Sequence, residues 1–497
     1  MLRRLVLLLL LLVSVKAESQ RWLIDYPSGE TEEVNFIGGD VSGEYNYSVG
    51  YKYDRFKCMI KPIALCIDGE GSYKDKVYHE IEKGYFCYAL RLGCGEVFVV
   101  ALCGAGVEDE VYDSLWFAII NTNLEVMKEE YVKIEAPYFS YGNTIHALEN
   151  DNDEIIVVTQ VTDDIQSEVN YNYDYAFYKV DNDCELLECS YLKNSSCYAD
   201  ISDFAIVPNT NLYAVFGNGM NPNNLETVFY IDDDLEYVTF DFIEDFDEYP
   251  NLLRPKFMCV DRWTDDGLLM SVQSTQTKGV NEWCPMVLKM DSDMNVVDVL
   301  NLERYDTTDY VSQYRSMLYV DSTTIYISTF WYRGRLDGIS PKNHATIYLI
   351  NDNMELLGRK TLEMTHFFNV LYIQATSDRG CLVQGYVDDG EQKRAVICKL
   401  AKSDFEIAVN VCDVSFSDVN VYPNPVSSLL NIDVCDNEGK SVKVEIYDML
   451  GRRYLDKDVV LNGNTIMLDV SPFPDGMYVY RVEYGEDSVV ENVFIKE

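Results

Sequence analysis

The residues with the clearest capacity for chemistry are carboxylates gathered in short turns. Asp232, Asp233 and Asp234 are consecutive, and closely spaced carboxylates are the ligands that Ca²⁺ prefers. An EF-hand-like loop also requires a glycine and a distal bidentate glutamate, and no copy of this turn has both in register. Because Asp and Asn also favour tight turns, we expect hairpin turns here. No cofactor is predicted, and Ca²⁺ would be sought only at Asp232 and Asp234.

No catalytic constellation can be recognised in the sequence. Its four histidines, His79, His146, His344 and His366, lie outside any zinc-binding spacing, and neither a Gly-x-Ser-x-Gly elbow nor a P-loop is present. A Cys–His pair stays open as an alternative, although structural thiols are more typical of an exported, cysteine-rich chain. Paired carboxylates of a glycosidase must lie about 5–10 Å apart in space, which sequence alone does not disclose. We therefore predict no catalytic residue and favour a protein that is not an enzyme.

Two of the fourteen cysteines are spaced like a cross-strand pair. Cys381 and Cys398 flank residues 388–391, Asp-Asp-Gly-Glu, and Asp-Gly is a strong signal for a two-residue hairpin turn. With Asp389 and Gly390 at the tip, the two cysteines would face each other at a non-hydrogen-bonded position, where Cα atoms are about 4.5 Å apart. This register predicts a disulfide, with two reduced thiols on a buried face as the alternative.

A repeat indicates the elements that position these side chains. The pattern apolar, Asx, any residue, Asx, apolar, polar recurs at intervals of 51–60 residues, with its first Asx at Asn121, Asp181, Asp232, Asp291 and Asn351. A looser copy occupies residues 400–405, and another begins at Ile67. Strand-like runs flank each copy, and four strands per about 50 residues is the size of a propeller blade.

We therefore predict an all-β protein whose residues 18–412 form a seven-bladed β-propeller. Seven blades over residues 22–410 give about 56 residues each, within the observed spacing, whereas six would give about 65. An N-terminal strand near Trp22 is expected to complete the last blade, which would bring both ends of the ring together. Six blades remain the alternative count.

The last 77 residues read as a separate small sandwich. Residues 421–497 contain six or seven short runs that mostly alternate apolar and polar residues, with turn residues between them. That density of strands predicts an immunoglobulin-like β-sandwich, joined to the propeller by a linker at residues 413–420.

Several motifs of this segment occur together in a fixed order. They include Tyr422, Pro423, Asn424 and Pro425, then Tyr447, Asp448, Gly451 and Arg452, then Gly476 and Tyr478, and finally Lys496. The segment resembles the C-terminal sorting domain of the type IX secretion system, with which Bacteroidetes pass proteins through the outer membrane. The resemblance implies that the type IX secretion machinery is a partner. It also implies that a surface protease removes the sandwich after export.

The other end of the chain reads as a cleavable signal peptide. Arg3 and Arg4 precede the apolar run Leu5–Val13, and a small-x-small cleavage site ends at Ala17. No later segment approaches the ~20 apolar residues of a membrane-spanning helix, so no transmembrane segment is predicted. We expect periplasmic transit followed by release or display at the outer cell surface.

The charge balance restricts the partners. The chain has 40 basic and 83 acidic residues, a net charge of −43, which would repel nucleic acid. We expect a secreted or cell-surface propeller that binds an extracellular ligand: a glycan, a peptide or a protein. The alternative is a secreted hydrolase or lyase with carboxylate chemistry in the propeller channel. The side chains that line this channel should discriminate between the two.

Overall fold

The computed structural model divides the chain into two compact units, residues 1–407 and 408–497, each described by itself. The described residues are 22–496, without 28, 30, 82, 105–111, 141–144, 164–173, 194–198, 220–225, 244–252, 265–266, 276–282, 292–294, 303–308, 313, 332–343, 364–365, 389, 391, 408–420, 423–424, 434–440, 449–451, 461–464, 475 and 485–487. The predicted signal peptide and linker therefore lie outside the described residues.

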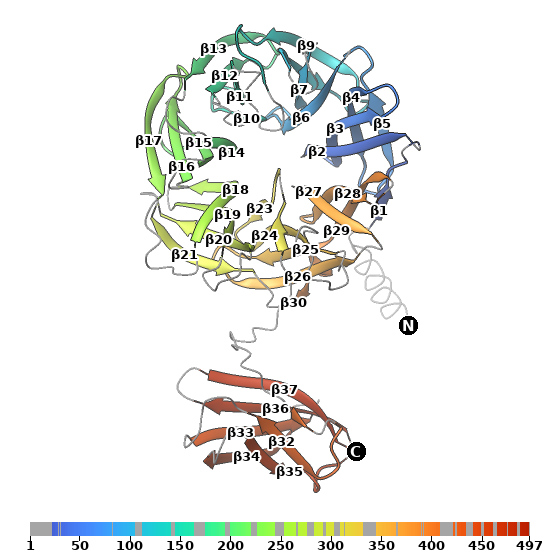
Figure 1. Cartoon of the computed structure of the whole chain (residues 1–497), viewed down its shortest axis with the longest axis vertical. Helices are drawn as coiled ribbons and strands as arrows, with labels where there is room; N and C mark the ends of the chain where they lie inside the picture. Colours follow the sequence, from blue (N-terminus) through green and yellow to red (C-terminus); the bar gives the residue numbers. More distant parts are fainter. Residues whose placement is uncertain are drawn as a thin grey trace, which may run out of the picture. The chain divides into compact units, whose positions relative to one another are not determined.

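The first unit is a seven-bladed β-propeller (Figure 1). Blade 1 contains β2 (Glu32–Ser42), β3 (Tyr45–Asp54), β4 (Met59–Ile67) and β5 (Tyr73–Val77). Blade 2 contains β6 (Gly84–Arg91), β7 (Val97–Cys103), β8 (Ser114–Ile120) and β9 (Val126–Lys133). Blade 3 contains β10 (Ile145–Glu149), β11 (Ile155–Val161), β12 (Asp174–Val180) and β13 (Leu186–Leu192). Blade 4 contains β14 (Ala199–Ile206), β15 (Leu212–Gly219), β16 (Glu226–Asp232) and β17 (Tyr237–Ile243).

The remaining three blades complete the ring. Blade 5 contains β18 (Leu253–Thr264), β19 (Gly267–Thr275), β20 (Trp283–Met290) and β21 (Val296–Asn301). Blade 6 contains β22 (Asp309–Val311), β23 (Met317–Asp321), β24 (Thr324–Trp331), β25 (His344–Ile350) and β26 (Leu356–Glu363), with β30 (Glu406–Ile407) added at its edge. Blade 7 contains β27 (Phe367–Ala375), β28 (Cys381–Asp388), β29 (Lys393–Leu400) and, from the other end of the chain, β1 (Trp22–Asp25). The predicted count of seven blades is confirmed.

Burial follows the position of each strand in its blade. The middle strands β7 and β11 are buried along their whole length, because both of their faces pack against neighbouring blades. The outer strand β9 alternates between partly buried and exposed residues over most of its length, as expected of a strand at the rim. Continuous apolar runs therefore form the blade interiors, and alternating runs form the outer edges.

The ring closes through its N-terminal strand, as predicted. In β1, Trp22 pairs with Lys399 and Asp25 with Val396 of β29. Beyond these pairs, Tyr26 N donates to Ala395 O at 2.9 Å. Closure of this kind removes the exposed sheet edges that an open array would leave.

The repeated Asx residues form the turns between the third and fourth strands of blades 1 to 6. In the turn at Asn121, Oδ1 accepts the amides of Asn123 at 2.8 Å and Glu125 at 3.0 Å. The apolar residue of the motif, Leu124, is fully buried with a φ of 61°. This arrangement explains why the motif requires Asx and an apolar residue at fixed positions. The first copy, at Asp68, has the same carboxylate-capped turn.

The looser copy at residues 400–405 is not such a turn. Residues Lys402–Asp404 form a short 3₁₀ helix, because the fourth strand of blade 7 is β1 and no hairpin has to follow β29. The main chain continues instead to β30, which pairs with β26.

Lysines attach several of these turns to the preceding blade. Lys128 Nζ donates to Asn182 O at 2.7 Å and lies 2.6 Å from Asp183 Oδ1. Lys74 and Lys289 make corresponding contacts, to Asn123 Oδ1 at 2.7 Å and to Asp352 O at 3.2 Å. The hydrogen bond to Asp183 raises the pKa of Lys128. The Asx turns therefore act as contact points between blades.

Replacement of Lys128 by Met is expected to lower the free energy of unfolding by about 0.5–1 kcal/mol, because it removes a partly screened ion pair and a hydrogen bond. Lys133→Met is the matched control, since its contact with Asp113 is 3.4 Å long and its side chain is 78% exposed. Urea unfolding of both variants measures the difference. Equal loss in the two would show that the contact between blades 2 and 3 adds nothing specific.

The second unit is a two-sheet sandwich. One sheet contains β31 (Val421–Tyr422), β32 (Leu429–Asp433) and β35 (Thr465–Asp469). The other contains β34 (Arg453–Val460), β33 (Ser441–Asp448), β36 (Gly476–Tyr484) and β37 (Ser488–Lys496). Buried residues from both sheets, among them Leu430, Ile446 and Tyr480, form a single core. The predicted immunoglobulin-like sandwich is confirmed.

Candidate ligand-binding channel

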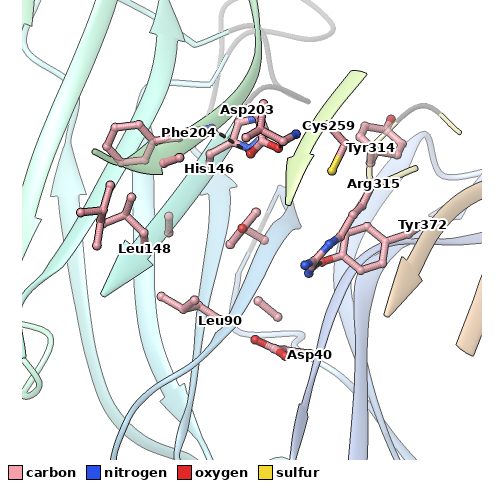
Figure 2. A pocket seen from close by; sticks show the side chains of 16 residues that line it. Asp40, Leu90, His146, Leu148, Asp203, Phe204, Cys259, Tyr314, Arg315 and Tyr372 are labelled. Carbon is pink, nitrogen blue, oxygen red and sulfur yellow. Dashed lines mark hydrogen bonds and ion pairs between the residues drawn. The ribbon is translucent and has the colours of Figure 1, made fainter. Parts of the chain in front are cut away.

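The innermost strands of all seven blades surround one cavity of about 440 Å³ (Figure 2). Its lining comprises Asp40, Tyr88, Ala89, Leu90, His146, Ala147, Leu148, Asp203, Phe204, Ala205, Ile206, Cys259, Val260, Tyr314, Arg315 and Tyr372. Figure 2 shows Leu90, Leu148 and Phe204 on one side, with Arg315 and Tyr372 facing them. The cavity therefore has an apolar wall and a polar, aromatic wall.

Four of the lining residues directly follow an irregularity in an inner strand. The register shifts immediately before Tyr88 in β6, Asp203 in β14, Cys259 in β18 and Tyr372 in β27. A β-bulge adds one residue and changes the direction of the side chains that follow. The bulges thus direct these four side chains into the channel.

Arg315 is positioned by a larger irregularity. The inner strand of blade 6 is split into β22 and β23, which both pair with β24, and Arg315 lies between them. Its main chain forms a parallel bridge with Tyr372 in β27, and Ile373 N donates to Arg315 O at 3.2 Å. The main chain at the break in blade 6 is therefore bonded to blade 7, which fixes the backbone position of Arg315.

Asp203 and His146 form the polar group of blades 3 and 4. His146 Nδ1 lies 3.5 Å from Asp203 Oδ1, and the imidazole lies 5.9 Å from the ring of Tyr88. Asp203 Oδ1 also accepts the amide of Phe204 at 2.8 Å, while Oδ2 accepts that of Val260 in blade 5 at 2.5 Å. The carboxylate thus joins two blades as well as facing the cavity.

Asp40 repeats this arrangement between blades 1 and 2. Its Oδ1 accepts the amide of Val41 and its Oδ2 that of Arg91, both at 2.7 Å. Burial raises the pKa of the Asp40 carboxyl, although the Arg91 amide and the charge of Arg315 act in the opposite direction. Asp40 is therefore a desolvated carboxyl beside a cation.

Tyr372 and Arg315 form the facing wall. The guanidinium carbon of Arg315 lies 5.9 Å from the centre of the Tyr372 ring, within range of a cation–π interaction. The Tyr372 hydroxyl donates to Gly39 O at 2.9 Å. Burial raises the pKa of both Tyr372 and Tyr88, so both hydroxyls stay protonated and can donate hydrogen bonds.

The extra residues at three of the inner-strand bulges belong to a buried cluster. Ile37, Cys87 and Leu371, from the inner strands of blades 1, 2 and 7, belong to one hydrophobic cluster, against which Tyr314 packs. Each residue comes immediately before or at the bulge of its strand. These apolar side chains therefore belong to the packed interior of the blades.

Replacement of Asp40 by Asn is expected to flatten the pH dependence of the free energy of unfolding. Because the native pKa of Asp40 is raised, its contribution to stability is complete below the unfolded pKa of about 4 and is lost as the pH rises through the native pKa. Denaturant unfolding from about pH 4 upwards measures this slope. Asp234→Asn, in an exposed turn, controls for the loss of one charge. An unchanged slope in Asp40→Asn would contradict the assignment.

Of the four histidines considered in the sequence, His146 lines the channel. Asp232 and Asp234 lie in a hairpin turn, where Asp232 Oδ1 accepts the amides of Asp234 at 3.1 Å and Glu236 at 2.9 Å. Within the described part of the chain, no group of three or more His, Cys, Asp or Glu is arranged to hold a metal ion. Sequence reasoning missed Asp40, Asp203 and Arg315, because nothing in the local sequence marks a bulge or a strand break.

The predicted Cys381–Cys398 disulfide is wrong in this structure. Asp388 pairs with Lys393, so the hairpin loop has four residues rather than two, and Cys381 lies opposite Leu400 while Cys398 lies opposite Val383. Both thiols are free. The loop begins after Asp388, as expected, but extends two residues further before the strands pair, and the Asp388 carboxylate accepts the amide of Gly390 at 2.8 Å within it.

The motif residues of the C-terminal segment are distributed over the sandwich. Tyr422 is in β31, Tyr447 and Asp448 are in β33, Arg452 precedes β34, Gly476 and Tyr478 are in β36, and Lys496 ends β37. Pro423, Asn424 and Gly451 lie outside the described residues, and Pro425 precedes Val426, whose amide donates to Ile495 O at 2.8 Å. The buried Tyr478 hydroxyl donates to Pro474 O at 2.7 Å. The entry segment and the last strand are thus joined.

Residues 420–496 match the family model described as a secretion system C-terminal sorting domain. The predicted type IX sorting domain is confirmed, and it indicates a secreted or cell-surface protein that interacts with the secretion machinery. No helix among the described residues has the length and apolar character needed to span a bilayer. No curated protein sequence matches this chain.

Several solved structures are similar to the chain at low identity. A protein of unknown function from Dyadobacter fermentans is 10% identical, with a TM-score of 0.43, over 78% of this chain and 98% of its own. The β-propeller domain of the Trilobed protease from Pyrococcus furiosus is 11% identical, with a TM-score of 0.41, over 80% and 99%. The acylaminoacyl peptidase of Pyrococcus horikoshii is 9% identical, with a TM-score of 0.43, over 82% and 59%. The fold assignment is based on the sheet topology of this chain.

Proposed function

We propose that this protein is a non-catalytic propeller that, once outside the cell, binds an extracellular ligand in its central channel. The ligand would be a glycan, a peptide or an exposed group of a protein. The observation that carries the proposal is a cavity of about 440 Å³ to which all seven blades contribute. Its volume lies in the range of ~300–1,000 Å³ typical of small-molecule pockets, which combine apolar walls with a few placed polar groups.

The hydrogen bonds of the two channel carboxylates favour binding over catalysis. Asp40 and Asp203 each accept one backbone amide on each oxygen, and in both cases one of these amides belongs to the next blade. A carboxylate held in this way is fixed in position and stabilises the junction between blades. A general acid or base must instead exchange a proton with its substrate.

A secreted hydrolase or lyase is the second candidate, because one observation favours it. Burial raises the pKa of Asp40, and a carboxyl that keeps its proton at higher pH is what a general acid requires. Asp203, beside His146, would then be its partner. In this case Asp40→Asn would abolish turnover of a bound ligand without abolishing its binding.

A variant that fills the cavity tests the binding function. Leu90→Trp is expected to abolish binding of ligands found by screening saccharides and peptides, because the larger side chain occupies the channel. Leu187→Trp, on the outer strand β13 at a position 51% exposed, is the matched control and should bind as the natural protein does. Binding that survives Leu90→Trp would place the ligand elsewhere and overturn the proposal. Products released from bound ligands would favour the hydrolase or lyase.

A further inference from the structure

The charges in the cavity disfavour a ligand that carries a net charge. Among the described residues of the lining, the formal charges are those of Asp40, Asp203 and Arg315, with His146 beside Asp203. An anion attracted by Arg315 would lie close to two carboxylates, and a cation attracted by the carboxylates would meet the guanidinium. These interactions are strong inside a protein, where the effective dielectric constant is low. A neutral ligand avoids both repulsions.

Acidic turns at the end of the ring where the cavity lies also disfavour anionic ligands. Leu90, Leu148 and Ile206 come at or near the end of their inner strands, so the cavity extends towards the turns that join first and second strands. In an antiparallel blade, the turns between third and fourth strands lie at this same end. Those turns contain Asp181, Asp232 and Asp291 and several neighbouring acids. Their summed negative potential would reduce the local concentration of anions.

The polar groups that line the cavity can form hydrogen bonds with a ligand that both donates and accepts them. Arg315 supplies donors, and the hydroxyls of Tyr88 and Tyr314 can donate or accept. The oxygens of Asp40 and Asp203 each keep a lone pair after accepting an amide. Vicinal hydroxyl groups on a ring match this mixed set, whereas an apolar ligand would leave buried polar groups unpaired.

The two walls and the volume of the cavity set the shape and size of the ligand. Leu90 and Leu148 provide an aliphatic surface for C–H groups opposite the tyrosine and arginine side chains (Figure 2). The cavity volume of about 440 Å³ limits the bound part of the ligand to a small group.

We propose that the cavity binds one or two rings of an uncharged saccharide. This inference depends on the proposed binding function and narrows it to one ligand class. A peptide end is disfavoured because its free carboxylate or ammonium group carries a full charge. Arg315 is the residue expected to contribute most to affinity, since its donors have a fixed geometry.

Isothermal titration of the full exported protein with matched sugars tests the proposal. The neutral probes are glucose, galactose, mannose, N-acetylglucosamine and the disaccharides cellobiose, maltose and lactose. Glucuronic acid and glucosamine are the anionic and cationic counterparts of the glucose ring, and short peptides with free and blocked ends form the last arm. At least one neutral probe should bind, with affinity reduced about tenfold or more by Arg315→Gln and abolished by Leu90→Trp. Glucuronic acid and glucosamine should bind more weakly than glucose.

The outcomes separate the inference from the proposed function. If peptides or charged sugars bind and Leu90→Trp abolishes that binding, the channel is a binding site and the neutral-saccharide inference is wrong. If no probe binds at millimolar concentration, or if binding is unchanged in Leu90→Trp, both proposals fail. The Leu187→Trp control and an unfolding curve for each variant distinguish a filled cavity from a misfolded ring.

Discussion

A chain that ends at Asp418 is expected to remain inside the outer membrane and to be absent from the cell surface and the medium. The sorting domain lies in residues 420–496, and this segment belongs to a compact unit of its own. All seven blades precede it, so the truncation leaves the propeller fold intact. Fractionation of a host that carries the type IX system, with antibody detection in periplasm, surface and medium, measures the effect. Full extracellular recovery of the truncated chain would disprove the role of the tail.

Two point variants show whether the fold of the tail, and not only its presence, is required. Ile446 is fully buried in the core of the sandwich, so Ile446→Asp would leave an unpaired buried charge and unfold that unit. Met467, on β35, is 68% exposed, and Met467→Asp introduces the same charge without harming the core. We expect loss of export in the first and normal export in the second. Equal export of both would contradict recognition of the folded sandwich.

Disruption of the closing strand is expected to have the largest effect on the propeller itself. Ile24 of β1 is buried against blades 1 and 7, so Ile24→Asp places an uncompensated charge in that core. The free energy of unfolding should fall by about 3–5 kcal/mol. The next residue, Leu23, points to the opposite face and is 57% exposed, so Leu23→Asp should change stability by less than ~0.5 kcal/mol.

Guanidinium unfolding followed by tryptophan fluorescence measures both closing-strand variants. A loss in Ile24→Asp no larger than that in Leu23→Asp would mean that β1 does not stabilise the ring. Hydrogen exchange adds a local readout, because the amides of β29 that pair with β1 should lose protection first.

The sequence predicted the blades because their defining turn is a local structure. An Asx side chain that caps two amides, followed by a buried apolar residue, involves only five residues, so its recurrence could be counted directly. The closing role of Trp22 and its neighbours followed from the same count. The turn at Asp388 shows the limit of this reasoning, since a four-residue loop stands where the local Asp-Gly signal indicated a two-residue tip.

The channel could not be predicted in this way. Asp40, Asp203 and Arg315 come together only because seven strands from distant parts of the sequence meet at one axis. The bulge before Asp203 and the break before Arg315 have no sequence signature of their own. Among 83 acidic residues, the two that face the cavity are distinguished by neighbours on other blades rather than by the residues beside them.

The pairing of β1 with β29 also determines when the ring can form. These strands are separated by nearly the whole length of the propeller, so their contact has a very high contact order and carries the largest loop-closure entropy in the unit. A chain emerging from a ribosome or a translocon can build blades 1 to 6 in succession, but blade 7 must wait for both ends. A circular permutant opened between two blades would make this junction covalent and should fold faster.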